Sequence, residues 1–507
     1  MNIHEKILTL DTLEQTLNNL RHVKTIVQCH GVFDLLHIGH IRHFKKAKTM
    51  GDILIVSVTP DRYVNKGPGR PVFPEKLRAE AIAALDFTDY VVINEWPTAV
   101  EIIGRIKPNI YVKGSEYREK VNDITGKITD EENAVKAVGG SISFTDDITF
   151  SSSNLINRYF PSFSDEVVDY LNRLKKKNSV DQILGYLESS SKLKVLVIGE
   201  AIIDQYNFCE TIGKSGKEPI LAVKHLKSEK YAGGSLAITN HVANFCKEVT
   251  CVTYLGEHKE YEPFILERLK ENVKLEPIYK CSSPTILKKR YIEEYTNQKL
   301  FEVYEINDEP LSGNLQKIFL NKIKELAPKF DLVIIGDYGH GLISEETTET
   351  IVSSAKFLSV NTQANAGNHG FNCIAKYPTA DYVCIAHREL ELTFRERNKP
   401  PEDHIKQLVR NFNYKNIVVT SGNKGSLTYR QGEEIVKVPA FSYQVKDRVG
   451  AGDSVLALTS LCMVQNAPIE IVGFIGNVVG AEAVAIMGNE RYIEKVALMK
   501  HISHLLK

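Results

Sequence analysis

Two histidines separated by two residues follow a short apolar segment near the N-terminus. Residues 31–40 read GVFDLLHIGH, so that His37 and His40 are one helical turn apart with Gly39 between them. Where such a pair opens a helix, both imidazoles lie beside free backbone N–H groups and the positive end of the helix dipole. Gly39 leaves room for a phosphate to approach the backbone. The arrangement suits attack at the α-phosphorus of a nucleoside triphosphate, because that reaction depends on positioning and charge stabilisation.

A second phosphate-handling pattern lies near the C-terminus. Residues 449–454 read VGAGDS and precede an apolar run. Gly450 and Gly452 allow backbone N–H groups to converge at a helix start, where they would stabilise charge on a transferred γ-phosphoryl group. Asp453, in the first turn, is placed to accept the proton of an attacking hydroxyl. Taken alone, the histidine pair also fits helix capping or zinc binding, and the aspartate also fits an N-cap.

The segments around the histidines alternate between short β-branched runs and helical patterns. We expect strands at residues 25–29, 53–58, 90–93 and 110–112, and helices at residues 38–50, 75–85 and 98–106. Apolar strands separated by helices predict βαβ units on a parallel sheet that is buried on both faces. The histidine pair would then follow the first strand and open the first crossover helix.

The rest of the chain divides into a connector and a second α/β region. A helical, charged segment covers residues 161–192, and a new apolar strand pattern begins at residues 195–199. Later strands are expected at 332–335, 382–385 and 417–420, and residues 449–487 are rich in helical patterns. The sequence therefore predicts an α/β protein with domains at 1–160 and 193–507 joined by a helical linker at 161–192.

Composition excludes several classes of protein. Lys+Arg and Asp+Glu both number 63, which gives no net electrostatic case for a nucleic-acid or acidic-membrane partner. No apolar run reaches the roughly 18 residues of a spanning helix. The 8 cysteines are scattered without a Cys-x-x-Cys pair or zinc-type spacing. We therefore expect a cytoplasmic protein with reduced thiols, which binds neither nucleic acid nor membrane.

The motif at residues 31–40 resembles the signature of the cytidylyltransferase/adenylyltransferase superfamily, and the likeness extends over about residues 5–158. The resemblance implies a Rossmann-like nucleotidyltransferase domain in which His37 and His40 are catalytic. It also implies a set of nucleotide-binding residues: Gly31, Phe33, Asp34, Gly39, Arg78, Lys113, Gly114, Ser151, Ser152 and Ser153. Many members carry an arginine shortly before the serine run, whereas residues 145–150 here read TDDITF. This departure leaves open whether ATP or CTP is the nucleotide substrate.

The C-terminal region is similar to the ribokinase/PfkB family over about residues 193–500. The resemblance implies a ribokinase-like α/β fold with Asp453 as catalytic base and Glu389 supporting Mg²⁺. The implied nucleotide-binding residues are Thr420, Gly422, Gly425, Gly450, Ala451, Gly452 and Asn477. The implied substrate-binding residues are Asp204, Gly233, Gly234, Lys288, Arg290 and Asp337. Three positions depart from the family pattern: Ala386 and Ala237 replace asparagines, and Asn361 replaces an aspartate.

Within that family, the nearest resemblance is to the heptose-7-phosphate kinases, carried by residues 197–206, 216–223, 285–290 and 337–341. Lys288 and Arg290 would pair with a second phosphate on the sugar, because a dianion favours clustered cations. The whole chain resembles the bifunctional heptose kinase/nucleotidyltransferases with the two domains in reversed order. We therefore expect a bifunctional transferase. It would phosphorylate heptose 7-phosphate at O1 with ATP and Mg²⁺, and transfer a nucleotidyl group from ATP or CTP to a sugar 1-phosphate with release of pyrophosphate.

Two alternatives remain open at this point. In the first, the same two activities serve a different sugar or polyol phosphate, with CTP, in the synthesis of a surface lipopolysaccharide or capsule; Ala237 and Asn361 motivate it. In the second, one domain is a non-catalytic nucleotide-binding or oligomerising module, which Ala386 and the missing arginine support. The expected partners are a small sugar phosphate, a nucleoside triphosphate and a second copy of the chain in a dimer.

Overall fold

The chain folds into two units that are described separately. The computed structural model describes residues 2–64, 66–67, 69–114, 127–145, 163–441 and 445–506. The first unit comprises Met1–Ser164 together with Met499–Lys507, and the second comprises Asp165–Leu498. The helices of the predicted linker, α8 (Asp165–Lys177) and α9 (Val180–Ser189), therefore group with the second unit. The domain boundaries expected from the sequence stay predictions.

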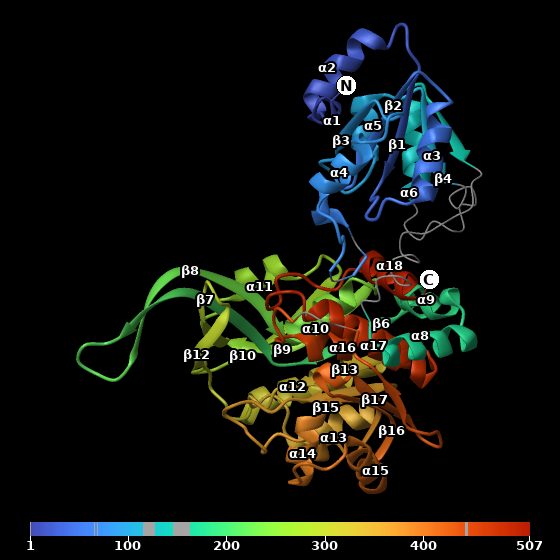
Figure 1. Ribbon diagram of the computed structural model, residues 1–507. Coiled ribbons are helices and arrows are strands. Elements are labelled where there is room, and N and C mark those ends of the chain that lie inside the picture. Colours follow the sequence, from blue (N-terminus) through green and yellow to red (C-terminus); the bar gives the residue numbers. More distant parts are fainter. Residues whose placement is uncertain are drawn as a thin grey trace. The chain divides into compact units, whose positions relative to one another are not determined.

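The first unit is built on a five-stranded parallel sheet in the order β3-β2-β1-β4-β5 (Figure 1). Its strands are β1 (Ile26–Gly31), β2 (Ile53–Val58), β3 (Tyr90–Ile93), β4 (Ile110–Gly114) and β5 (Ser141–Thr145). Its helices are α1 (Ile3–Lys6), α2 (Leu10–Leu20), α3 (Ile38–Lys48), α4 (Glu75–Ala83), α5 (Val100–Ile106) and α6 (Lys127–Ala137), with a short 3-10 helix at Asp61–Tyr63.

Helices cover both faces of this sheet, as the buried apolar strands predict. Side chains of α2, α5 and α6 form one apolar core, and those of α3 and α4 form the other. The strand order reverses between β1 and β4, and in doubly wound sheets ligands bind at the carboxyl ends of the strands beside such a reversal. The end of β1 leads into the histidine motif, and the end of β4 carries Lys113 and Gly114.

The second unit contains two sheets. The larger has nine strands in the order β10-β9-β6-β13-β14-β15-β16-β17-β18, parallel as far as β16 and antiparallel beyond it. These strands are β6 (Lys194–Gly199), β9 (Glu248–Gly256), β10 (Val273–Lys280), β13 (Leu332–Asp337), β14 (Leu358–Thr362), β15 (Thr379–Ala386), β16 (Asn413–Thr420), β17 (Ser426–Arg430) and β18 (Val436–Val438). Its order reverses between β6 and β13, which marks the ligand edge of this unit.

The smaller sheet has four strands in the order β12-β11-β7-β8. They are β7 (Ala201–Lys214), β8 (Leu221–Gly234), β11 (Ile286–Glu293) and β12 (Gln298–Glu305). The β7–β8 hairpin projects from the body of this unit (Figure 1). β7 follows β6 directly and β8 leads into α10, so both ends of the hairpin start at the ligand edge of the larger sheet.

Helices pack on both faces of the nine-stranded sheet. The helices of this unit are α8 and α9 with α10 (Ser235–Ala243), α11 (Glu262–Arg268), α12 (Gly313–Leu326), α13 (Glu345–Ser354), α14 (His387–Phe394), α15 (Pro401–Asn411), α16 (Ala451–Met463) and α17 (Ile469–Ala483), and short 3-10 helices lie at Ser190–Lys192, Ala327–Lys329, Ile374–Lys376 and Gly422–Lys424. A last helix, α18 (Lys495–Leu505), begins in this unit and continues into the residues from Met499 that belong to the first unit. Helices α12 to α15 share one core with the sheet, and α16 packs against α10, α17 and the central strands. Within the described residues, no helix combines the length and apolar character needed to cross a membrane.

Candidate active sites

His37 and His40 lie side by side at the start of α3. His37 is the N-cap residue, and its Nδ1 accepts a hydrogen bond from the Gly39 N–H at 3.1 Å. The two imidazole rings stack with their centroids 3.9 Å apart. The Nε2 atom of His37 is buried and has no hydrogen-bond partner among the described residues. Because Nδ1 accepts, a neutral His37 carries its proton on Nε2, which leaves a buried donor that a phosphate oxygen would satisfy.

Burial favours the uncharged form of both imidazoles. Burial lowers the pKa of His37. Burial, followed by the charges of His37, His43 and Lys66, lowers the pKa of His40 to about 3. The pair would therefore stabilise a phosphate as hydrogen-bond donors, beside the free N–H groups of the helix start.

Gly31 and Phe33 support this pair from the preceding loop. Phe33 has a positive φ of 51°, and its ring meets His40 edge-on with a centroid separation of 5.2 Å. A Cβ atom on Gly31 would lie 2.9 Å from the Phe33 ring. A side chain at position 31 would therefore displace the ring that fixes His40.

Asp34, predicted to bind the nucleotide, instead anchors a neighbouring loop. Its side chain is 1% exposed and pairs with Arg70 at 2.7 Å. The same carboxylate accepts the backbone N–H groups of Val72 at 2.7 Å and Phe73 at 3.1 Å. This arrangement favours a structural role for Asp34 over the predicted direct contact.

The guanidinium of Arg78 also hydrogen-bonds to groups of the protein itself. Its guanidinium is 1% exposed, and it donates to the carbonyl oxygens of Phe73, Val32 and Thr59 and to the carboxylate of Asp61. The predicted phosphate contact would require Arg78 to leave these partners. The geometry favours a role in holding together the loops that follow β1 and β2.

Lys113 and Gly114 lie at the end of β4, beside the strand that leads to the histidines. The Lys113 ammonium is 12% exposed and lies 2.7 Å from the Glu131 carboxylate. Ser151, Ser152 and Ser153 lie outside the described residues, so their predicted phosphate contacts stay predictions.

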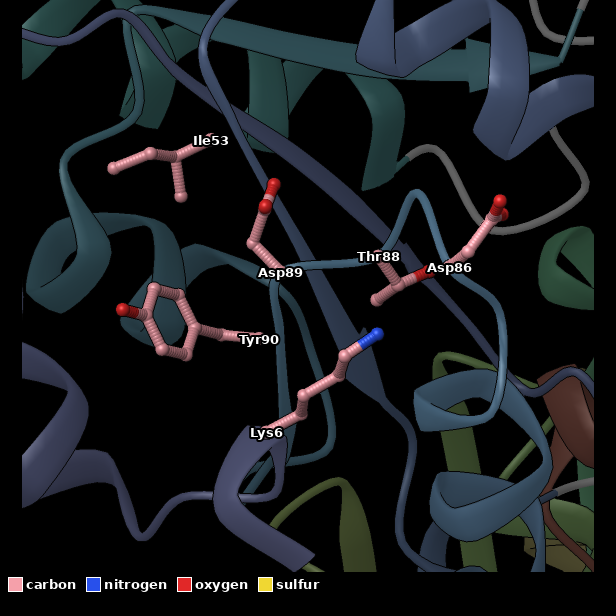
Figure 2. Close-up of a pocket in the computed structure, with 6 residues that line it drawn as sticks. All are labelled: Lys6, Ile53, Asp86, Thr88, Asp89 and Tyr90. Atoms are coloured by element: carbon pink, nitrogen blue, oxygen red, sulfur yellow. The ribbon is translucent and has the colours of Figure 1, made fainter. Parts of the chain in front are cut away.

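A hollow of about 380 Å³ opens at the opposite edge of the same sheet, where β2 and β3 begin (Figure 2). Two of its charged side chains have partners within the protein: Lys6 donates to the Leu85 carbonyl, and Asp89 accepts from Lys48 and from the Leu54 N–H. Neither histidine lines it. The hollow is therefore not part of the phosphate site.

Asp453 lies in the first turn of α16, which Gly450 caps with a left-handed φ of 78°. The Tyr338 hydroxyl, from the loop after β13, donates to Asp453 Oδ1 at 2.7 Å. Burial raises the pKa of Asp453 to about 7, while the Tyr338 hydrogen bond opposes that shift. A carboxylate with such a pKa beside converging N–H groups is suited to take a proton from a hydroxyl that attacks a phosphate.

Asp204, Lys288 and Arg290 lie on adjacent strands of the smaller sheet, with Lys288 in register with Asp204. Arg290 donates to Asp204 Oδ1 and, at 2.9 Å, to Glu302. In contrast, no described carboxylate lies within ion-pair distance of the Lys288 ammonium, although Lys288 is 6% exposed. The Lys288 ammonium lies 5.1 Å from the centroid of the Tyr304 ring. Of the two predicted phosphate partners, Lys288 is the one available for a ligand.

Gly233 and Gly234 allow the hairpin to close around Asp204. A Cβ atom on Gly233 would lie 2.1 Å from Asp204 Oδ2, and one on Gly234 would lie 2.5 Å from the Glu200 carbonyl oxygen. Gly234 also has a positive φ of 60°. Gly233 is therefore required by its close approach to the predicted sugar-binding carboxylate, and Gly234 by its backbone conformation and its approach to the Glu200 carbonyl.

Four of the predicted nucleotide residues, Thr420, Gly422, Gly425 and Asn477, lie near the ends of β16 and β18. A Cβ atom on Gly425 would lie 2.1 Å from the Val438 carbonyl, which explains a glycine beside Thr420 and Gly422. Asn477 donates to the same Val438 carbonyl at 2.9 Å and to that of Pro439 at 3.0 Å. Asn477 therefore fixes the backbone of this edge.

Glu389 lies in the first turn of α14 and accepts the Ala386 N–H at 2.8 Å. Burial raises the pKa of Glu389 to about 7, and the Asp453 charge contributes to the shift. Within the described residues, no three His, Cys, Asp or Glu side chains gather as a metal site. Glu389 and Asp453 are nonetheless near enough to interact electrostatically.

Comparison with known sequences identifies this unit. Residues 192–493 match the profile of the pfkB family carbohydrate kinases, which is more than half of the chain. The chain belongs to the pfkB family of carbohydrate kinases. Residues 29–158 match the cytidylyltransferase-like profile, so this pfkB-family chain carries a cytidylyltransferase-like domain ahead of its kinase domain.

The relatives of this pfkB-family chain include bifunctional proteins. The bifunctional protein HldE of Syntrophotalea carbinolica is 36% identical over 157 residues, which cover 30% of this chain and 31% of that protein. HldE of Campylobacter jejuni is 26% identical over 278 residues, 54% of this chain and 57% of that protein. The matches thus span about a third and just over half of these relatives.

A solved structure supports the fold of the pfkB-family unit. Phosphofructokinase-2 of Escherichia coli in complex with fructose-6-phosphate aligns with a TM-score of 0.51 at 16% identity, covering 62% of this chain and 100% of that chain. The predicted ribokinase-like α/β architecture is therefore confirmed.

Two residues of the pfkB-family site escaped the sequence analysis: Tyr338, which holds Asp453, and Glu200, which holds Tyr338. The fully buried Glu200 carboxylate accepts the N–H groups of Tyr338 and His340, each at 3.0 Å. Asp337, predicted to bind substrate, is fully buried and occupied by four donors: the Gly339 N–H, Asn372, Lys376 and Tyr377. Asp337 therefore supports the same loop, and its geometry does not favour the predicted substrate contact.

Proposed function

We propose that this chain activates a sugar phosphate in two reactions. The kinase domain transfers the γ-phosphoryl group of ATP to O1 of heptose 7-phosphate, and the cytidylyltransferase-like domain joins a nucleotidyl group to a sugar 1-phosphate. The observation that carries the proposal is that one chain contains two helix starts suited to phosphate: the His37/His40 pair on α3 and Asp453 on α16.

In the kinase reaction, Asp453 accepts the proton of the sugar O1 hydroxyl as that oxygen attacks the γ-phosphorus. The bond to the β-phosphate oxygen breaks, and ADP leaves. N–H groups at Gly450–Gly452 stabilise the charge on the transferred group. Asp204 would bind a sugar hydroxyl, and its geometry is fixed by Arg290 and by the absence of a side chain at Gly233.

Lys288 supports a substrate that already carries a phosphate. A buried ammonium without a carboxylate partner is costly unless an anion joins it, and burial accordingly lowers the pKa of Lys288. Lys288 is also close enough to Asp453 to influence its ionisation. A phosphorylated sugar would bring a dianion to this position.

The kinase residues also fit Mg²⁺. Carboxylate oxygens are the ligands that Mg²⁺ prefers, and it commonly uses one or two of them together with water and substrate phosphates. Glu389 and Asp453 would hold the ion, directly or through water, and the ion would neutralise charge on the nucleotide phosphates.

In the transferase reaction, an oxygen of the sugar 1-phosphate attacks the α-phosphorus of ATP or CTP, and pyrophosphate leaves. His37 and His40 would donate hydrogen bonds to the nucleotide phosphates, while the N–H groups at the start of α3 stabilise the developing charge. Lys113 would approach the substrate from the adjacent strand.

We also propose that the chain forms a dimer through the β7–β8 hairpin. Its outer part exposes large apolar side chains in both strands and the turn: Ile212, Ile220, Leu221 and Leu226 are 69%, 61%, 47% and 40% exposed. Contiguous exposed apolar side chains of this kind are typical of a surface that a partner covers.

The test is turnover of a substrate panel read by mass spectrometry. The protein is incubated with heptose 7-phosphate, other sugar phosphates or a polyol phosphate, with ATP, CTP and Mg²⁺ supplied. Sugar 1-phosphates are supplied separately for the transferase reaction. Phosphorylation of heptose 7-phosphate and formation of a nucleotide-heptose are expected. Turnover of another sugar or polyol phosphate alone would contradict the heptose assignment, and absence of one half-reaction across the panel would contradict the bifunctional proposal.

A further inference from the structure

A buried carboxylate outside both predicted motifs joins the smaller sheet of the kinase unit to the segment that precedes α16. Asp447 lies in the segment that leads into α16, three residues before Gly450, and its side chain is 3% exposed. Its two oxygens accept five hydrogen bonds: from Lys299 Nζ at 2.7 Å, the Tyr206 hydroxyl at 2.6 Å, and the N–H groups of Arg448, Val449 and Gly488 at 2.7, 3.2 and 2.9 Å.

The two side-chain donors come from the smaller sheet. Lys299 is on β12, and Tyr206 is on β7, two residues after the predicted sugar ligand Asp204. The Lys299 ammonium also lies 5.6 Å from the centroid of the Tyr206 ring. The strand that carries the sugar ligand is therefore tied to the segment that precedes the anion-binding helix start.

The backbone donors to Asp447 come from the segment before α16 and from Gly488, which lies next to both Tyr206 and Gly450. A Cβ atom on Gly488 would lie 3.2 Å from the Tyr206 ring, and Gly488 has a positive φ of 52°. A Cβ atom on Gly450 would lie 2.3 Å from Asn489 Oδ1. Residues 488–489 are therefore packed between Tyr206 and Gly450, so a shift of Tyr206 would displace the backbone at Gly450.

The buried charge of Asp447 depends on its ion pair with Lys299. Burial by itself raises the pKa of Asp447, but the hydrogen bonds from Lys299, Tyr206 and Gly488 and the charge of Lys299 together keep the pKa below its usual value. Removing the only cation that pairs with Asp447 in the described residues would leave a buried charge with neutral donors alone. Such a charge is strongly destabilising, so the segment would rearrange or take up a proton.

We propose that Asp447 is a positioning residue of the kinase. Through Lys299 and Tyr206 it couples the placement of the sugar-binding sheet to the arrangement of the phosphate-binding N–H groups at Gly450–Gly452. The smaller sheet and α16 share no strand or helix, and these side-chain contacts join them. The proposal rests on the sugar kinase activity proposed above.

The test compares Lys299→Met with Lys289→Met, a matched control on β11 whose partner is Glu305. For the sugar phosphate that the wild type uses best, Lys299→Met should lower kcat by about 10- to 100-fold, the loss expected for a buried charge-assisted hydrogen bond. The KM for the sugar should change by less than about threefold, Lys299→Arg should restore most of kcat, and the control should match the wild type.

Amide hydrogen exchange supplies a readout that does not depend on turnover. Exchange at residues 446–453 should be faster in Lys299→Met than in the wild type or Lys289→Met, with exchange at α12 unchanged. Equal exchange and equal kcat in both lysine variants would overturn the proposal, and so would faster exchange throughout the unit with a matching loss of thermal stability. If the wild type phosphorylates no sugar, the proposed function fails, and the exchange comparison still decides whether Asp447 couples the smaller sheet to the segment that precedes α16.

Discussion

Tyr338→Phe tests most sharply how the kinase base is tuned. The substitution removes one atom, the hydroxyl that donates to Asp453 Oδ1 at 2.7 Å, and keeps the aromatic ring. A hydrogen bond to a charged acceptor contributes about 1.5–3 kcal/mol. At about 1.4 kcal/mol for each pKa unit, its loss should raise the pKa of Asp453 by about one to two units.

The sign of the effect follows from the role of Asp453. Only the carboxylate accepts a proton, and burial already raises its pKa to about 7. The charged groups that influence it, Asp204 and Lys288, are unchanged by the substitution. The acid limb of kcat/KM should therefore move from near pH 7 to about pH 8–9 in Tyr338→Phe, with activity recovering at higher pH.

The assay is ADP release across pH 5.5–9.5 with saturating ATP. Tyr377→Phe is the matched control, because its hydroxyl donates to Asp337 at 2.8 Å in the same region and does not reach Asp453. The control should keep the wild-type limb. A Tyr338→Phe profile that is lower by a constant factor at every pH would refute the reasoning and leave Tyr338 a packing residue.

Three further predictions follow from the same geometry. Lys288→Met should raise the KM for a phosphorylated sugar at least about tenfold in steady-state assays, because a buried ammonium is lost, and an unchanged KM would exclude a Lys288–phosphate contact. Gly233→Ala should abolish sugar binding measured by calorimetry while leaving ATP binding intact, because the added Cβ atom would overlap the Asp204 carboxylate. Full sugar affinity in this variant would show that Asp204 is not the sugar ligand. Thermal unfolding of Asp453→Asn should show a stability that increases relative to the wild type as pH rises from about 4 to about 7, which are the pKa values of Asp453 in the unfolded and the folded chain. The wild type loses stability over this window because its unfolded chain ionises Asp453 more readily than the folded chain does, and asparagine does not ionise. A stability difference that does not vary with pH would contradict this prediction.

The sequence predicted much of the fold because its signals are local. The strands β1 to β4 of the first domain are mostly apolar, and their observed bounds differ from the expected ones by two residues at most. The β7–β8 hairpin was not delineated, since β8 carries exposed residues along most of its length and lacks the apolar run of a buried strand.

Candidate site residues could be predicted where glycine and a polar side chain occur together at the start of a helix. His37, His40 and Asp453 each lie beside a glycine at such a start. Tyr338 and Glu200 lie 138 positions apart in the sequence, and their relation to Asp453 exists only in the folded chain.

The roles of Arg78, Arg290 and Asp337 could not be predicted from the sequence, although their positions match the family pattern. Each matches a family position, yet their charges are matched by partners that only the fold brings close. A residue type at the expected position therefore does not distinguish a ligand contact from the scaffold that supports it.

The most direct test of two separate phosphate sites measures both half-reactions in His40→Ala and Asp453→Ala. ADP formation from ATP and a sugar phosphate reports the kinase, and pyrophosphate release with a sugar 1-phosphate reports the transferase. His40→Ala should lose pyrophosphate release and retain ADP formation, and Asp453→Ala should show the reverse. Survival of both reactions in both variants would contradict the account.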